Sequence, residues 1–365
     1  MTKRESNILK CVAIMLMLAH HLFMYAAEPG FPELIYGPAF STPGRLAAFG
    51  QLSKLCVTIF VFITAYGTTR TYKGDPMRDS QAIITISLRR LVKLLISFQV
   101  VYIVAALLCP LGGKSWFTLY SGSRLENLVF AFFDFMGISF IINTPSYNSS
   151  WWYMSLAVTF ILVMPLLIKL CRRYGFFVLL LEILLVRWLE VNWVLYRYLL
   201  PTVVGILMAE YDVIEQLTEI YRRSGPVKKA GFYLGIFAVL GLGSVLWLRA
   251  GDGLLDIYET VLLLPVLLLT LFVLARIPYL NNAAEFVGRH SMNMFLVHAF
   301  IYQNWFYDFT YSLKYPALIY LFLFISSLAA SVAIEMLKKW LRIQRLTSWV
   351  SDRLCRVLVR QAGMV

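Results

Sequence analysis

The stretch KCVAIMLMLAHH, residues 10–21, places one lysine and two adjacent histidines at opposite ends of a nearly unbroken run of apolar and small side chains. In an α-helix, His21 lies roughly 16 Å from Lys10 along the axis. That distance is about half the thickness of the hydrocarbon core of a bilayer. An ionisable side chain at such a depth is costly and indicates a functional site. The stretch therefore predicts a membrane helix that carries chemistry.

The composition of the whole chain is that of a membrane protein. Of its 365 residues, 60% are hydrophobic and only 15% are charged, and the mean hydropathy is +0.72. Soluble domains carry ~25% charged residues. We predict an all-α polytopic membrane protein, with residues 1–340 as the membrane domain and 341–365 as a basic cytoplasmic tail. The tail either lies amphipathically along the inner leaflet or is solvated.

The cysteines and the net charge exclude several other classes of protein. The chain has 5 cysteines without C-x-x-C spacing, namely Cys11, Cys56, Cys109, Cys171 and Cys355. This pattern indicates neither a disulfide framework nor a zinc site, and we expect no bound metal. The net charge of +13 is explained by lysine and arginine in cytoplasmic loops that face anionic lipid. We therefore expect the lipid bilayer, and not nucleic acid, as a partner.

The distribution of basic residues predicts the topology. Apolar segments occupy residues 11–27, 48–68, 83–108, 126–142, 151–168, 176–190, 194–210, 230–249, 257–275, 290–310 and 316–337. If the N-terminus is inside, the basic cluster at residues 169–173 is also inside only when segment 126–142 does not cross. We therefore predict that 126–142 is a re-entrant or interfacial part of an external segment, 109–150. About ten transmembrane helices then remain, with both termini in the cytoplasm.

Helical geometry selects one of the two histidines. Positions eleven apart on a helix differ by about 20°, so Lys10 and His21 share a face, whereas His20 lies about 80° away from Lys10. A lysine that attracts an anionic group toward a neutral imidazole suits a general base. The alternative is an interfacial lysine and a histidine that bonds to a neighbouring helix.

The segment SLRRLVKL, residues 87–94, contains Arg89, Arg90 and Lys93 at the cytoplasmic start of the third helix. Arg90 and Lys93 are three residues apart and face the same way. Because guanidinium groups match phosphate oxygens, this segment could hold a phosphorylated ligand. The alternative is ordinary positive-inside anchoring.

Two further segments carry candidate binding residues. Trp151 and Trp152, in SSWWYMSL at the outer end of the fifth helix, favour an aromatic belt over a platform that stacks against sugar rings. In GRHSMNMFLVH, residues 288–298, Ser291 and His298 share a face near Asn293; they bind a polar substrate or serve as interhelical contacts. Further polar residues in or near predicted spans are Glu182, Arg187, Glu190 and Glu259.

Together these residues resemble the integral-membrane acyltransferase 3 family over residues 4–340. The family's basic residue, ten intervening residues and catalytic histidine fall on Lys10 and His21. Its arginine-x-x-arginine falls on Arg90 and Lys93, with lysine in place of the second arginine. Its phenylalanine-rich run before Ser-Gly-Tyr appears as FVFITAYG, with Thr64 and Ala65 before Tyr66. The remaining matches are Trp151, Trp152, Gly288, Ser291, Leu296 and His298.

The resemblance implies an O-acyltransferase that moves an acyl group, usually acetyl, from cytoplasmic acyl-CoA to a hydroxyl of a cell-envelope carbohydrate or related acceptor. It implies a multi-pass protein of a bacterial cytoplasmic membrane, with acyl-CoA as a donor substrate and no permanently bound cofactor. His21 and Lys10 would be catalytic, and Arg89, Arg90 and Lys93 would bind the donor. The expected cavity or acceptor-binding residues are Thr64, Tyr66, Trp151, Trp152, Ser291, Asn293 and His298. Direct transfer and a covalent acyl-histidine both remain open, as does the alternative of a transporter or flippase for a sugar or anionic substrate. The oligomeric state is not predicted.

Overall fold

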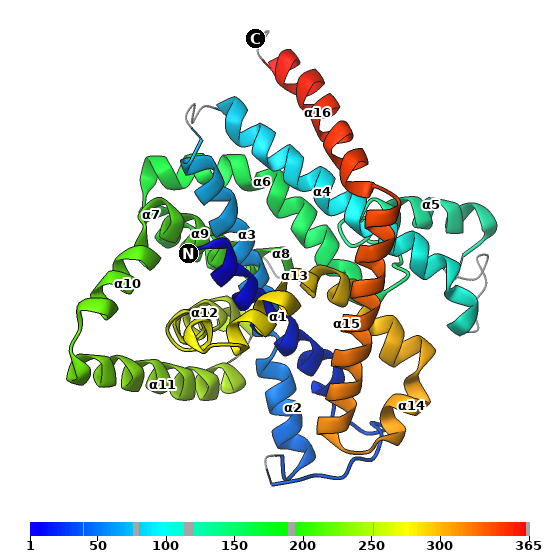
Figure 1. Ribbon diagram of the computed structural model, residues 1–365, viewed down its shortest axis with the longest axis horizontal. Helices are drawn as coiled ribbons and strands as arrows, with labels where there is room; N and C mark the ends of the chain where they lie inside the picture. Colours follow the sequence, from blue (N-terminus) through cyan, green and yellow to red (C-terminus); the bar gives the residue numbers. More distant parts are fainter. Residues whose placement is uncertain are drawn as a thin grey trace. The chain divides into compact units, whose positions relative to one another are not determined.

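The computed structural model describes residues 1–362 except 39, 76–79, 113–119, 121, 189–193 and 251. Its helical content is 82%, and the described residues contain no strand (Figure 1). The all-α prediction is therefore confirmed. The chain divides into two compact units, which are described separately. Unit 1 comprises residues 1–73 and 166–291, and unit 2 comprises residues 74–165 and 292–365.

The helices are distributed over the two units. Unit 1 contains α1 (Lys3–Phe23), α2 (Pro43–Leu52), α3 (Leu55–Lys73), α7 (Phe177–Trp188), α8 (Val194–Arg197), α9 (Leu199–Glu210), α10 (Val213–Arg223), α11 (Pro226–Arg249), η4 (Asp252–Leu254), α12 (Leu255–Phe272) and η5 (Leu274–Arg276). Unit 2 contains α4 (Ser80–Leu107), η1 (Cys109–Gly112), α5 (Arg124–Phe135), η3 (Ser149–Trp151), η6 (Phe300–Trp305), α14 (Tyr307–Ser312), α15 (Pro316–Trp340) and α16 (Ile343–Ala362). Two helices, α6 (Trp152–Tyr174) and α13 (Leu280–Ala299), have residues in both units.

Among the described residues, 7 helical segments are long and apolar enough to cross a membrane. They are Lys3–Phe23, Pro43–Lys73, Ser80–Leu107, Ser149–Tyr174, Pro226–Arg249, Leu255–Arg276 and Pro316–Trp340. The other predicted spans fall on shorter or more polar helices. For example, α7 and α9 have 12 residues each, which corresponds to roughly 18 Å against a core of ~30 Å. The count of about ten spans remains a prediction.

The apolar segment at residues 126–142 is too short a helix to cross a membrane, since α5 has 12 residues. Its aspartate is buried: the Asp134 carboxylate accepts hydrogen bonds from the hydroxyls of Tyr120 (2.8 Å), Ser139 (3.2 Å) and Ser146 (2.8 Å) and from the Tyr147 N–H (2.7 Å). Burial raises the pKa of this carboxyl, whereas these hydrogen bonds oppose the increase. The segment therefore folds around Asp134. This arrangement is compatible with the prediction that residues 126–142 do not span the membrane.

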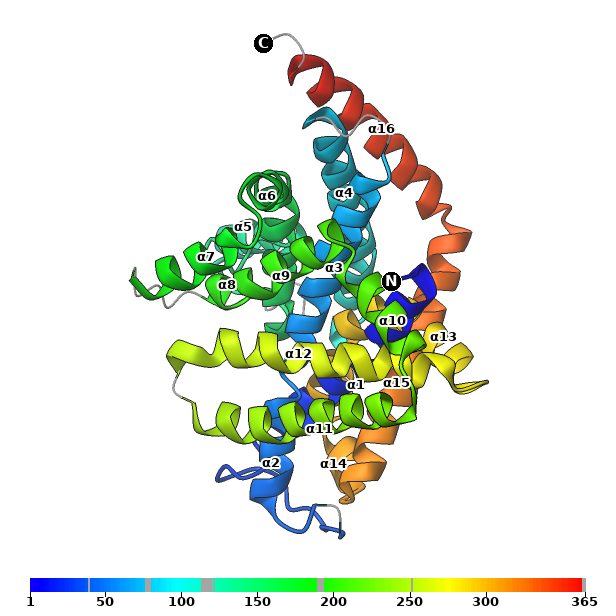
Figure 2. The ribbon, with the colours of Figure 1, turned by 90° about the vertical axis from the view of Figure 1, so that its left-hand side faces the viewer.

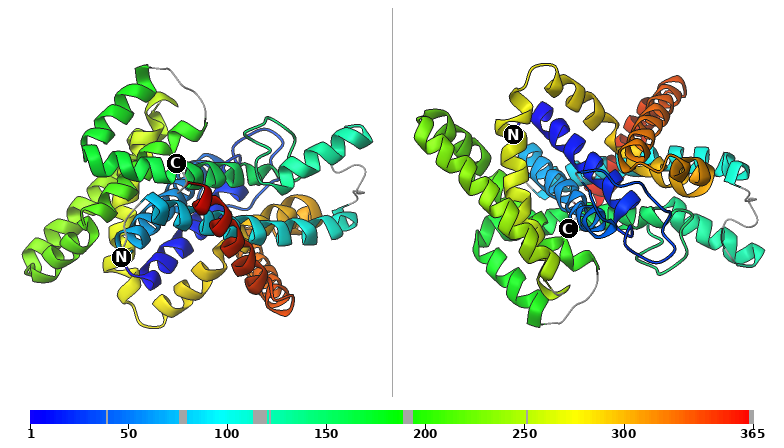
Figure 3. Two further views of the ribbon diagram at one scale, coloured as in Figure 1. Left: turned by 90° about the horizontal axis from the view of Figure 1, so that it is seen from above. Right: turned by 90° about the horizontal axis from the view of Figure 1, so that it is seen from below.

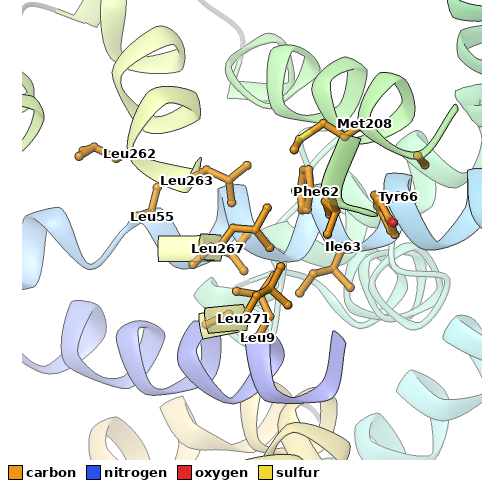
Figure 4. Packing of buried hydrophobic residues seen from close by; sticks show 14 of the residues in the cluster. Leu9, Leu55, Phe62, Ile63, Tyr66, Met208, Leu262, Leu263, Leu267 and Leu271 are labelled. Atoms are coloured by element: carbon orange, nitrogen blue, oxygen red, sulfur yellow. The ribbon is translucent and has the colours of Figure 1, made fainter. Parts of the chain in front are cut away.

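Unit 1 has its core around α3, which contacts α9, α1 and α12. In Figure 4, Phe62 of α3 lies near Met208 of α9, and Leu9 of α1 lies beside Leu271 of α12. The contact between α3 and α9 depends on small residues: a Cβ on Gly205 would lie 2.9 Å from the Phe62 carbonyl oxygen. Small residues let membrane helices approach closely without a hydrophobic driving force.

Two helix pairs in unit 1 can be followed in the other views. Figure 2 shows α11 and α12 running alongside each other, as their contacts indicate. In the right-hand view of Figure 3, the dark blue α1 lies beside α3, which it also contacts. These contacts place α1 at the centre of unit 1, between α2, α3 and α12.

The C-terminal tail contains a helix, because α16 follows α15 and packs against α4 in unit 2. The Arg89 guanidinium lies 3.2 Å from the Asp352 carboxylate of α16. Residues 343–362 are thus helical, while residues 363–365 lie outside the described part. An amphipathic tail along the inner leaflet and a solvated tail both remain predictions. The domain boundary at residue 340 remains a prediction.

Helix α13 meets α1 at a glycine in unit 1. A Cβ built on Gly288 would lie 1.7 Å from the carbonyl oxygen of Asn7, which leaves no room for a side chain. Gly288→Ala must push the two helices apart, and we expect it to destabilise the protein by about 1–3 kcal/mol. The measurement is the thermal unfolding midpoint of purified protein in detergent.

The matched control is Gly241→Ala on α11, where an added Cβ meets no atom within 4 Å. Alanine is favoured over glycine inside a helix, so this control should be neutral or slightly stabilising. Equal midpoints for the two variants would contradict the close contact between α13 and α1.

Candidate active site

The predicted catalytic pair lies on α1, which begins earlier than the sequence suggests. A capping box formed by Thr2 and Glu5 starts the helix at Lys3, and the helix ends at Phe23. His21 therefore lies in the last turn, roughly 27 Å from Lys3 along the axis. The expected depth of His21, about half of the hydrocarbon core beyond Lys10, remains a prediction. Lys10 and His21 are both half-buried.

The neighbouring His20 has a packing contact that fixes its ring. It is buried, and its Nδ1 lies 2.8 Å from the Gly50 carbonyl oxygen of α2. Because a carbonyl oxygen only accepts, this Nδ1 carries a proton and donates. A Cβ on Gly50 would lie 2.5 Å from the Met24 nitrogen, so α2 reaches the end of α1 only through a glycine. The rings of His20 and His21 meet edge to face at 5.1 Å.

Thr64 and Tyr66, predicted to line the cavity, form hydrogen bonds within unit 1. The Thr64 hydroxyl donates to the Phe60 carbonyl oxygen of its own helix at 2.9 Å. The buried Tyr66 hydroxyl donates to the Glu215 carboxylate of α10 at 3.1 Å, and Arg70 lies 3.3 Å from the same carboxylate. Tyr66 thus links α3 to α10 at the end of unit 1 where α1 begins.

Buried ion pairs in unit 1 use the polar residues noted in the predicted spans. Glu259 pairs with Arg197 and accepts a hydrogen bond from Thr58 at 3.1 Å, and Arg187 lies 2.8 Å from Asp256. Both oxygens of the buried Glu182 carboxyl lack a hydrogen-bond partner among the described residues. Arg197 and Asp256 were not predicted as site residues, although a charged residue within an apolar run is itself a signal. Glu190 lies outside the described residues.

The predicted donor-binding residues lie in the first half of α4, in unit 2. Arg89 is exposed and pairs with Asp352, Arg90 is half-buried, and Lys93 is exposed. The structure therefore leaves Lys93 accessible on the helix that carries the other two cations. This arrangement suits recognition of a multiply charged anion such as a phosphate.

A buried lysine of α15, Lys338, contacts α4 one turn beyond Lys93 and was not predicted as a site residue. The Lys338 ammonium of α15 donates to Ser97 of α4 (2.6 Å) and to the amide oxygen of Asn293 (2.7 Å), and the Asn293 amide donates to Glu335 (2.7 Å). Ser97 is seven residues after Arg90 and therefore shares its face of the helix. Asn293 acts here as an interhelical contact, which is one of its two predicted roles.

Trp151 lies in the core of unit 2. Its side chain is 1% exposed, and its indole N–H donates to the Leu296 carbonyl oxygen at 3.1 Å. The rings of Phe98 and Phe300 lie 4.9 and 5.5 Å away. A lipid-facing aromatic belt is therefore wrong for Trp151. Trp152 is half-exposed and remains available for such a role.

His298 and Ser291 are both buried on α13, with His298 in unit 2 and Ser291 in unit 1. The Nδ1 of His298 lies 2.6 Å from the Phe295 carbonyl oxygen, and its ring lies nearly parallel to Tyr302. Directly after His298 the chain forms a π-helical segment, η6. Such segments are frequent at functional sites, but they cannot be predicted from apolar periodicity.

The structure assigns the predicted site to the two units as follows. Unit 1 holds Lys10, His21, Thr64, Tyr66 and Ser291, and unit 2 holds Arg89, Arg90, Lys93, Trp151, Trp152, Asn293 and His298. The predicted catalytic pair and the predicted donor-binding cations thus lie in different units. Among the described residues, no three His, Cys, Asp or Glu side chains are grouped as metal ligands, and all five cysteines are buried.

Comparison with known families gives one match. A family model described as an acyltransferase domain, Acyl_transf_3, matches residues 4–336. No curated protein and no solved structure matches the chain. The matched region covers nearly the whole chain and contains every predicted site residue.

Proposed function

The chain belongs to the acyltransferase 3 family and is a membrane acyltransferase, and we propose that it moves an acyl group, most simply acetyl, from cytoplasmic acyl-CoA to a hydroxyl of a cell-envelope carbohydrate. The observation that carries the proposal is that Lys10 and His21 lie on one face of an unbroken helix, α1, within the matched region. Membership of the family favours this enzyme over a transporter or flippase. Transfer of label from acetyl-CoA by the purified protein tests the donor.

We propose a bacterial cytoplasmic-membrane protein with about ten spans, both termini inside, and residues 109–150 outside. Contacts inside unit 1 support this orientation. The ammonium of Lys73, at the end of α3, lies 2.6 Å from Asp212, which precedes α10. The N-terminal amine lies 2.7 Å from Glu215 of α10, so the start of α1, the end of α3 and α10, which ends in Arg222 and Arg223, share one end of the unit.

Single cysteines test this topology. The five native cysteines are buried and can stay, whereas Ser149 and Lys228 are exposed. An impermeant maleimide added to intact cells should label Ser149→Cys but not Lys228→Cys, and lysis should expose both. Labelling of Lys228→Cys alone on intact cells would refute the orientation.

The cations of α4 are proposed to bind the phosphates of coenzyme A. Changing Arg90 and Lys93 together to glutamine should raise the KM for acetyl-CoA roughly tenfold or more, because each charged hydrogen bond contributes ~1.5–3 kcal/mol. The turnover number should change much less, since contacts remote from the thioester contribute mainly uniform binding. Arg90→Lys should also raise KM, because the planar fork is lost.

The matched control for this prediction is Lys339→Gln, an exposed cation outside the proposed donor site. It should leave KM unchanged. An unchanged KM in the double variant would mean that Arg90 and Lys93 serve only as topological anchors.

His21 is proposed as the general base. In direct transfer, the acceptor oxygen bonds to the thioester carbonyl carbon, the carbon–sulfur bond breaks, and the hydroxyl proton passes through the imidazole to the thiolate. In the covalent variant, the imidazole first takes the acyl group and then yields it to the acceptor hydroxyl. Lys10 would attract the anionic donor toward this face of α1.

His21→Ala should lower turnover by about 10²–10⁴ while the protein stays folded. His20→Ala should lose stability, because its bond to Gly50 is removed, yet retain much of the turnover per folded molecule. Lys10→Ala should give an intermediate loss, and Lys10→Arg should be tolerated. Acyl transfer by the variants, normalised to the folded fraction, decides between the histidines: if His20→Ala is the inactive one, the assignment of the base is wrong.

A further inference from the structure

Unit 1 contains a cavity of about 160 Å³ that none of the proposed acyl-transfer residues lines. It lies beside the first turns of α1 and is closed by Thr218 of α10 and by the end of α12 with η5. By the proposed orientation this is the cytoplasmic end of the unit. A cavity at the cytoplasmic end of a membrane protein is accessible to lipid headgroups and to soluble anions.

Two aromatic rings hold a cation at the wall of this cavity. The Arg276 guanidinium lies 5.1 Å from the centroid of Tyr221 and 5.4 Å from that of Phe272. The two rings stack nearly parallel, at 4.3 Å and 10°. Cation–π contacts fix the guanidinium plane without consuming its N–H donors. Within the described part of the chain, no carboxylate forms an ion pair with Arg276.

The charged side chains that line the cavity are two cations, Arg4 and Arg276, and one carboxylate, Glu5. Arg4 borders it and lies 3.4 Å from Glu285, and the Lys229 ammonium lies 5.2 Å from the Tyr221 centroid. The one carboxylate in the lining, Glu5, already accepts the Thr2 N–H at 2.7 Å. The N-terminal end of α1 adds the positive end of a helix dipole.

We propose that this cavity binds a phosphate group, with Arg276 as its principal ligand. The surroundings favour the phosphodiester of an anionic lipid, because α10 buries Ile214 and Tyr221 while Arg222 and Arg223 are exposed. The exposed Val227 follows directly at the start of α11. Basic pockets beside amphipathic helices on the cytoplasmic side recognise anionic headgroups. A soluble phosphate ester is the other source of the same chemistry.

The test is the thermal unfolding midpoint of the full-length protein in detergent, titrated with three probes. These are dihexanoyl-phosphatidylglycerol, glycerol 3-phosphate, which lacks the nucleotide of coenzyme A, and the phosphate-free dihexanoyl-glycerol. A phosphate-bearing probe should raise the midpoint by several degrees. Arg276→Gln should weaken its apparent affinity at least tenfold, with a smaller loss for Arg276→Lys.

The control is Arg173→Gln, an exposed cation whose guanidinium lies 5.4 Å from the Tyr174 ring centroid and does not line the cavity; it should bind like the native protein. If Arg276→Gln does not fold, Ala275→Leu fills the cavity without removing the guanidinium and should also abolish binding. A response to phosphatidylglycerol identifies a lipid site, and a response to glycerol 3-phosphate alone identifies a site for a soluble ester. A response that does not depend on Arg276 or on cavity filling, or that is equal for dihexanoyl-glycerol, would overturn the proposal. None of these measurements requires acyl transfer, so the outcome is separate from that of the proposed function.

Discussion

Close packing around α1 is the constraint on which unit 1 depends. Helices gain no hydrophobic advantage by associating in lipid, so they associate where small residues allow backbone contact. α1 meets such positions at both ends: Gly288 at Asn7, and Gly50 at Met24. A helix held at both ends presents its side chains at fixed angles, which is what a catalytic group requires. The register of Lys10 and His21 therefore follows from glycines that carry no chemistry themselves.

The buried charges separate into structural and unassigned groups once their partners are known. Arg197 with Glu259, and Lys338 with Asn293, form contacts between helices that remove the cost of an isolated charge. In the sequence such residues look functional, because a charged residue within an apolar run is rare whether its role is structural or functional. Lys93 and the stacked Arg276 differ, because each presents a cationic group whose environment leaves donors available. The contacts that each charged side chain makes therefore distinguish structural from unassigned charges, which residue type alone does not.

Those features that composition and helical period determine could be predicted from the sequence. Its apolar segments predict the all-α architecture, and Asp134 together with the charge pattern predicts that residues 126–142 do not span the membrane. The polar first turns of α1, which a capping box of Thr2 and Glu5 begins, precede the apolar segment and have no apolar period from which they could be predicted. Trp151 donates to the Leu296 carbonyl oxygen, and Lys338 donates to Ser97; both hydrogen bonds join residues that are distant in sequence. Local patterns carry no information on such contacts, and the same holds for the cavity beside Arg276.

Helix geometry also explains why two histidines stand side by side. Adjacent residues on a helix point about 100° apart, so neighbours with the same chemistry meet different surroundings. The ring of His20 is buried against α2, where its Nδ1 is committed to the Gly50 carbonyl oxygen. That bond fixes the last turn of α1 and, through the ring contact at 5.1 Å, limits the orientations open to His21. A base must be held in position to transfer protons efficiently. In this chain the residue that positions the proposed base is thus its own neighbour.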